Sequence, residues 1–187
     1  YSYSDGDQAY TWSPDGKWIA LVEDSSDSRR YISIISPDGG TPVRVFDHYT
    51  EVTSPTGIKF YLRPNPTIFG GFSPDNKYLY FSRKIYDESR GSACIFSENG
   101  KGVSVRGVVD VVDRLDLTTG EITEIAEGCT YCALSRSGKY LLYGALGIST
   151  TVKKLETGET WPLPVYNLYC ITPDDQFVIY TASSKNV

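Results

Sequence analysis

One phrase occurs four times in this chain and constrains its fold more than any other feature. Each copy has a bulky apolar residue, then Ser or Thr, a short polar turn, an aromatic residue and an apolar run. The copies read TWSPDGKWIALV at 11–22, FSPDNKYLYFS at 72–82, LSRSGKYLLYG at 134–144 and ITPDDQFVIYT at 171–181. Self-similarity at such spacings indicates one supersecondary unit used repeatedly.

The polar turn inside the phrase predicts a strand, a tight turn and a second strand. Proline fixes φ for a turn, aspartate accepts from the backbone two residues on, and glycine or asparagine tolerates a positive φ. We expect structural turns at Pro14, Asp15, Gly16, Pro74, Asp75, Pro173 and Asp174. The residues after the turn are apolar at both odd and even positions, so the strand that they form is expected to be buried on both faces. Trp12 and Trp18 are therefore expected to pack between neighbouring units.

A second hairpin follows three of the copies, with turns at DGG, TTGE and ETGE. Each full unit then has four antiparallel strands. The composition agrees, because 15 Tyr, 17 Gly and 10 Pro among 187 residues favour short strands and tight turns. The sequence predicts an all-β fold, a β-propeller of four-stranded antiparallel blades, with about three and a half to four blades in this chain.

The S-P-D-G-K-[WY] phrase and the later D-L-x-T-G-E type of hairpin resemble the TolB-like, WD-like β-propeller repeat over residues 10–183. Similar repeats occur in periplasmic TolB proteins, in the propellers of prolyl oligopeptidase family enzymes and in many secreted proteins. The resemblance implies the fold and leaves the activity open, because one fold hosts many functions.

We expect a single β-propeller domain, or part of one, over residues 1–187. The repeat units are placed at 10–47, 70–126, 132–164 and 169–187, with insertions at 48–69 and 84–110. Long insertions on a repeat scaffold often bind partners, although these could instead cover a blade edge. Because aromatic and Arg side chains anchor interfaces, the candidate interaction residues are Tyr49, Phe60, Tyr61, Arg63, Phe69, Tyr86, Arg90 and Phe96.

The last unit stops after its first hairpin, which leaves a strand edge without its usual neighbour. Three remedies are open: the chain continues beyond residue 187, residues 1–8 supply an outer strand, or another copy donates strands. The third would make the protein self-assemble into an oligomer or filament.

Four cysteines, Cys94, Cys129, Cys132 and Cys170, are compatible with disulfides in an oxidising compartment, and buried free thiols are the alternative. The C-T-Y-C pair lacks the βαβ context of a redox motif, and the chain has one His, so no metal site is expected. No cofactor is expected either.

The sequence also narrows the function. A net charge of -5 with scattered Lys and Arg disfavours binding to nucleic acid. No apolar run is long enough to span a membrane. The sequence has no G-x-S-x-G motif, the nucleophile elbow of serine hydrolases. We expect a non-enzymatic scaffold for protein–protein interaction, binding a protein partner or copies of itself. The alternative is a fragment of the substrate-gating propeller of a prolyl oligopeptidase-type serine peptidase. The chain begins at Tyr1 and contains no Met, which fits either a trimmed chain or a secreted protein after removal of its leader. The second explanation gives the expectation of an extracellular or periplasmic protein.

Overall fold

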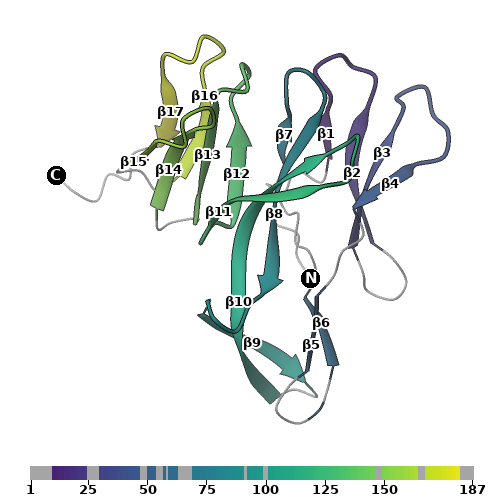
Figure 1. Cartoon of the computed structure of the whole chain (residues 1–187), viewed down its shortest axis with the longest axis vertical. Helices are drawn as coiled ribbons and strands as arrows, with labels where there is room; N and C mark the ends of the chain where they lie inside the picture. The colour runs from purple at the N-terminus through teal and green to yellow at the C-terminus, as the bar shows by residue number, and fades with distance from the viewer. Residues whose placement is uncertain are drawn as a thin grey trace.

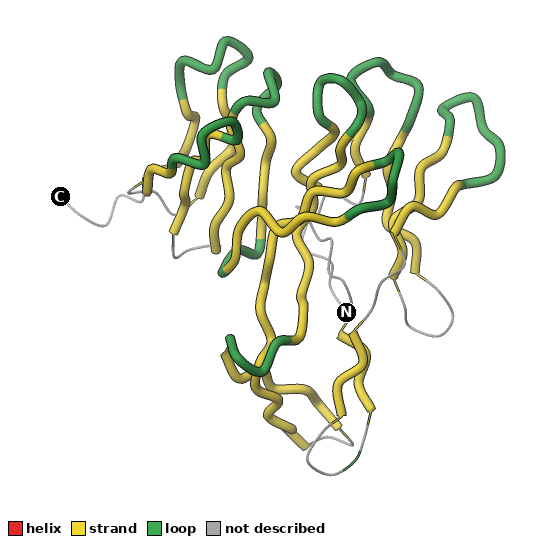
Figure 2. Tube along the Cα trace, viewed as in Figure 1, coloured by secondary structure: helices red, strands yellow, loops and turns green. Residues whose placement is uncertain are grey.

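The computed structural model describes residues 10–24, 30–46, 50–53, 57, 59–62, 69–90, 92–98, 101–145, 149–163 and 167–181. All regular elements in these ranges are β-strands (Figure 1). The colouring by secondary structure shows strands joined by short loops at one end of the sheets (Figure 2).

The strands form four successive sheets and one separate hairpin, and every pair of strands is antiparallel. The first sheet has the order β1 (Tyr10–Trp12), β2 (Ile19–Asp24), β3 (Arg30–Ile35) and β4 (Val43–Phe46). The second sheet has the order β11 (Ile122–Glu127), β10 (Lys101–Asp116), β8 (Tyr78–Tyr86) and β7 (Phe69–Phe72), with β9 (Ser92–Glu98) also paired to β10. The third sheet has the order β12 (Tyr131–Leu134), β13 (Tyr140–Ala145), β14 (Ser149–Lys154) and β15 (Thr160–Leu163). The last sheet pairs β16 (Asn167–Ile171) with β17 (Val178–Thr181), and the separate hairpin pairs β5 (Thr50–Thr53) with β6 (Lys59–Leu62).

This architecture confirms the predicted fold class. The first and third sheets are complete four-stranded antiparallel blades, the second is a blade with one extra strand, and the last holds two strands. In Figure 1 the first sheet lies on the right, the second in the middle, and the third and last sheets on the left. The described residues thus make three blades and part of a fourth.

The four copies of the repeated phrase form the same hydrogen-bonded turn. In the first copy the Ser13 hydroxyl accepts from the Trp18 amide at 2.9 Å and donates to Asp15 Oδ1 at 2.7 Å. The same oxygen of Asp15 accepts from the Lys17 amide at 3.1 Å. The hydroxyls that accept in the same way in the other copies belong to Ser73, Ser135 and Thr172. The fourth turn residue has a positive φ throughout, at Gly16, Asn76, Gly138 and Asp175.

Apolar side chains from neighbouring sheets form the core. The first cluster joins the first and second sheets and contains Ala20, Ile32, Phe46, Phe69, Phe72, Leu79, Phe81 and Leu115. The second cluster joins the second and third sheets and contains Tyr80, Val112, Cys129, Cys132 and Leu141. Neighbouring turns also meet, because a Cβ on Gly138 would lie 2.5 Å from Pro74 Cδ. Face-to-face packing of successive sheets is the arrangement expected of propeller blades.

The two insertions are built largely of strands. Residues 48–69 contain β5 and β6, and they end in β7, which starts at Phe69. In residues 84–110 the strands of the second sheet simply continue, because β8 extends to Tyr86 and β10 begins at Lys101. Strand β9 pairs with residues 101–108 of β10 and makes an arm below the second sheet (Figure 1). The arm consists of β9 and residues 101–107 of β10.

Candidate interaction surfaces

The predicted interaction residues of the first insertion lie in different settings. Phe60 and Tyr61 lie on β6, whose side chains fall outside the description, and Tyr49 and Arg63 lie outside the described residues. Phe69 was predicted to anchor a partner from a loop, and this prediction is wrong. It lies on β7, is 3% exposed and packs in the first core cluster, because β7 is the strand that starts the second blade.

In the second insertion, Tyr86 ends β8 and its hydroxyl donates to Glu88 Oε1 at 2.7 Å. This hydrogen bond to an acceptor is the main reason that the pKa of Tyr86 is raised. Phe96 lies on β9, whose side chains are outside the description.

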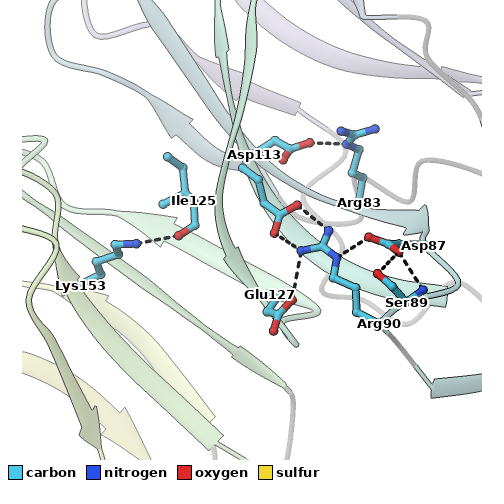
Figure 3. Close-up of polar contacts among 9 residues, drawn as sticks. Arg83, Asp87, Ser89, Arg90, Asp113, Ile125, Glu127 and Lys153 are labelled. Atoms are coloured by element: carbon cyan, nitrogen blue, oxygen red, sulfur yellow. Dashed lines mark hydrogen bonds and ion pairs between the residues drawn. The ribbon is translucent and has the colours of Figure 1, made fainter. Parts of the chain in front are cut away.

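Arg90 was predicted to face a partner, but its guanidinium is engaged within the chain (Figure 3). It donates to both carboxylate oxygens of Glu124 at 2.8 Å, to Glu127 at 3.2 Å and to Asp87 at 3.0 Å. The hydrogen bond to Glu124 is the largest of the effects that raise the pKa of Arg90, and Arg90 in turn lowers the pKa of Glu124. These contacts attach the chain segment before β9 to β11.

The segment that leads from β8 to β9 passes close to β10 at Gly107. The amide of Asp87 donates to the Gly107 carbonyl at 2.7 Å, and a Cβ on Gly107 would lie 2.9 Å from the Asp87 carbonyl oxygen. Gly107 also has φ +88°, a region that L side chains rarely occupy. Gly107 and Arg90 therefore fix the base of the arm.

A buried ion pair lies in the second sheet. Arg83 Nε donates to Asp113 Oδ2, and the Asp113 side chain is fully buried (Figure 3). Burial raises the pKa of Asp113, and the Arg83 guanidinium opposes this effect. Arg83 also lies over the ring of Phe46 in the first sheet, 5.5 Å from its centroid. The pair therefore contributes to the contact between the first two sheets.

The cysteines are held as thiols where their side chains are described. Cys129 and Cys132 are buried and Cys170 is exposed, and none of the three is in a disulfide. Burial raises the pKa of Cys129 to about 12, and it raises the pKa of Cys132 as well. Their thiols pack in the second core cluster, which agrees with buried thiols, the alternative to disulfides, for these two residues. Cys94 lies on β9, outside the described side chains.

Within the described side chains, no cluster of three or more His, Cys, Asp or Glu is arranged to hold a metal ion. No helix in the same part of the chain is long and apolar enough to cross a membrane.

Exposed apolar side chains gather on the two outermost sheets. Among the described residues, the exposed large hydrophobic side chains are Tyr10, Trp12, Trp18 and Val43 on the first sheet, Trp161 on the third, and Phe177 and Ile179 on the last. The prediction that Trp12 packs between units is wrong, since it is 51% exposed. Its equivalent Phe72 is 6% exposed, because the first sheet covers Phe72 whereas no described sheet covers Trp12. Trp18 is likewise only partly covered.

Solved structures resemble this arrangement. TolB from Acinetobacter baumannii matches with a TM-score of 0.59 and 17% identity, over 96% of this chain and 38% of that one. An acylaminoacyl peptidase in complex with Z-Gly-Gly-Phe-chloromethyl ketone matches with a TM-score of 0.54 and 14% identity, over 91% of this chain and 27% of that one. The chain therefore spans less than two fifths of the length of either structure. No protein-family model matches the sequence, and no curated protein matches it. By its repeats and its sheet architecture, the chain resembles a TolB-like β-propeller.

Proposed function

We propose that the chain is a non-enzymatic β-propeller scaffold that binds protein, including copies of itself, through its open ends. One observation supports this proposal: of the seven exposed large hydrophobic side chains among the described residues, four lie on the outward faces of the first and last sheets, and these are Tyr10, Trp12, Phe177 and Ile179. Exposed apolar side chains that lie together often mark an interaction surface, whereas single scattered ones are common on any protein surface. The last sheet has two strands among the described residues, and pairing of a further strand at its edge would add to this contact.

Several side chains of types that often serve in catalysis have structural roles here. The repeated serines hold turns, the thiols of Cys129 and Cys132 lie in the core, and Asp113 is paired with Arg83. A raised pKa makes a buried thiol less nucleophilic, because the thiolate is the reactive form. These placements favour a scaffold over an enzyme.

Site-specific crosslinking tests the proposal. A photoreactive benzophenone amino acid is placed at Tyr10, which is exposed beside Trp12, in cells that make the protein. The same amino acid at Thr119, in the exposed turn before β11, provides the control. We expect protein adducts at position 10 that exceed those at position 119 and that disappear with Trp12→Asp. Equal labelling at both positions, or adducts that do not depend on Trp12, would contradict the proposal.

A second candidate is the gating propeller of a serine peptidase whose catalytic domain is not in these residues. The similarity to an acylaminoacyl peptidase over 91% of this chain favours it. An antibody against the chain and a fluorophosphonate probe for serine hydrolases would be applied to the source cells. Peptidase gating requires one polypeptide much larger than 20.8 kDa that carries both labels. A polypeptide that binds the antibody without the probe rules this candidate out.

We also propose an extracellular or periplasmic location, which the similarity to TolB supports. Fractionation of the source cells, followed with the same antibody, tests it. Recovery of the protein in the cytoplasmic fraction alone would contradict this location.

A further inference from the structure

The internal contacts between sheets show what kind of surface each outer sheet presents. Each copy of the repeated phrase sends alternate residues to opposite faces of its blade. In the second sheet Phe72 and Leu79 face the first sheet, and Tyr78 and Tyr80 face the third. We call the face of a sheet that is turned toward the next sheet along the chain its trailing face, and the opposite face its leading face. Both core clusters join the trailing face of one sheet to the leading face of the next.

The first sheet presents a leading face with no described sheet against it. Trp12 pairs with Ile19, and Tyr10 with Leu21, so these four side chains share one face of the sheet. The opposite face carries Ala20, which is buried against the second sheet. Trp12 and Tyr10 are exposed, and Ile19 and Leu21 are only partly buried, whereas the equivalent Leu79 and Phe81 of the second sheet are fully buried.

The last sheet presents the complementary trailing face. Ile179 occupies the repeat position of Ala20, Tyr80 and Leu142, all of which are buried. Ile179 itself is 49% exposed, and Phe177, the equivalent of the partly buried Tyr78, is 67% exposed. The residues that are exposed at the two ends are thus those that the repeat buries elsewhere.

We infer that the leading face of the first sheet binds the trailing face of the last sheet of a second copy. The inference rests on the proposed function and names the partner and the two surfaces. Both surfaces exist in one molecule, and their packing would continue the contact that already joins the first sheet to the second and the second to the third. Such a contact is head-to-tail: it uses different surfaces on the two copies and produces a ring or an open chain of copies.

The charge of the chain predicts how this association responds to salt. The side chains named on both faces are apolar, while each copy carries a net charge of -5. Repulsion between like-charged copies is screened by salt, and apolar burial is not. Association should therefore strengthen between 0.05 M and 0.5 M sodium chloride, which is opposite to the behaviour of a contact made by ion pairs.

Light scattering coupled to size-exclusion chromatography tests the inference on the 187-residue chain. The wild type is expected to have a mass that exceeds 20.8 kDa and rises with concentration. Trp12→Asp and Phe177→Asp should each reduce the mass to that of one copy, because either change disrupts every head-to-tail contact. Trp161→Asp is the matched control, because Trp161 is 39% exposed on the third sheet, away from both faces. The Trp161→Asp variant should associate as the wild type does.

Mixing the two variants makes the test specific. Trp12→Asp retains an intact trailing face and Phe177→Asp an intact leading face, so an equimolar mixture should form a complex of two copies and grow no further. A wild type of 20.8 kDa at every concentration would overturn the inference, as would a Phe177→Asp variant that still self-associates or a mixture that stays monomeric. If the copies do not associate but crosslinks from position 10 to another protein persist, the scaffold proposal survives without this inference. If neither association of copies nor crosslinks from position 10 are observed, both the scaffold proposal and this inference are contradicted.

Discussion

Removing the Ser73 hydroxyl should destabilise the protein more than removing its counterpart, the Thr172 hydroxyl. The Ser73 hydroxyl accepts from the Tyr78 amide at 2.9 Å and donates to Asp75 Oδ1 at 2.6 Å, and Ser73 is buried. A neutral hydrogen bond contributes about 1 kcal/mol and one to a charged group about 1.5–3 kcal/mol. Because water can reach Asp75, we expect Ser73→Ala to lower the free energy of unfolding by about 2 kcal/mol.

The same two hydrogen bonds occur in the last sheet, which allows a comparison within one molecule. Thr172 accepts from the Phe177 amide at 3.0 Å and donates to Asp174 at 2.5 Å, but both bonds are exposed to solvent. Water replaces them more readily there, so Thr172→Ala should cost less than about 1 kcal/mol. Urea unfolding followed by tryptophan fluorescence, at a concentration at which the protein is monomeric, measures both changes.

Ser73→Thr is the control, because it keeps the hydroxyl and is the residue type that the fourth copy uses. The free energy of unfolding of Ser73→Thr should be close to that of the wild type and above that of Ser73→Ala. The reasoning is refuted if Ser73→Ala and Thr172→Ala lower the free energy of unfolding equally, or if Ser73→Ala lowers it by less than about 0.5 kcal/mol.

The pH dependence of stability provides a second check. The Ser73 hydroxyl lowers the pKa of Asp75 from 3.8, so its contribution is present above that pH and is lost as the pH falls below it. The difference between wild type and Ser73→Ala should therefore shrink below pH 3.8.

Three further outcomes follow from the second sheet and the thiols. Gly107→Ala places a methyl group against the Asp87 backbone, at a residue with a positive φ. It should lower the urea midpoint of unfolding by an amount equivalent to roughly 1–3 kcal/mol. An unchanged midpoint would contradict the close approach of the Asp87 backbone to Gly107. Iodoacetamide should modify Cys170 in the native protein far faster than Cys132, as resolved by peptide mass spectrometry; equal rates would contradict the burial of Cys132. Arg90→Lys removes the planar guanidinium that donates two parallel hydrogen bonds to Glu124, so trypsin should cut the arm faster than in wild type. Unchanged cleavage would mean that the Arg90 contacts do not hold the arm.

The repeated turn was largely predictable because its chemistry is local. Proline, aspartate and glycine have backbone preferences that depend on a few neighbouring residues, and Gly16 and Asn76 have the positive φ that the pattern requires. The role of the hydroxyl at Ser13 was missed, although a Ser or Thr in all four copies was the signal for it. The sequence also indicated four-stranded units, because the two hairpins of each unit are short-range features.

The predictions that depended on distant partners were less successful. Arg90 was assigned to a partner, but Glu124, 34 residues away, takes its guanidinium. Trp12 was predicted to be buried because the repeat buries that position, and burial requires a sheet on that side. The second insertion was read as loop, whereas β8 and β10 extend through it, since a strand continues wherever another strand pairs with it.

The arrangement of the core has a consequence for how the molecule unfolds. Each apolar cluster is shared by two neighbouring sheets, and neither spans three. Stability in such a structure is approximately a sum of terms for each unit and for each contact between neighbours. The second sheet takes part in both clusters and should exchange its amide hydrogens most slowly, while β16 and β17 should open first. Unfolding would then proceed inward from the ends, in steps of one sheet, as in a short linear polymer of blades.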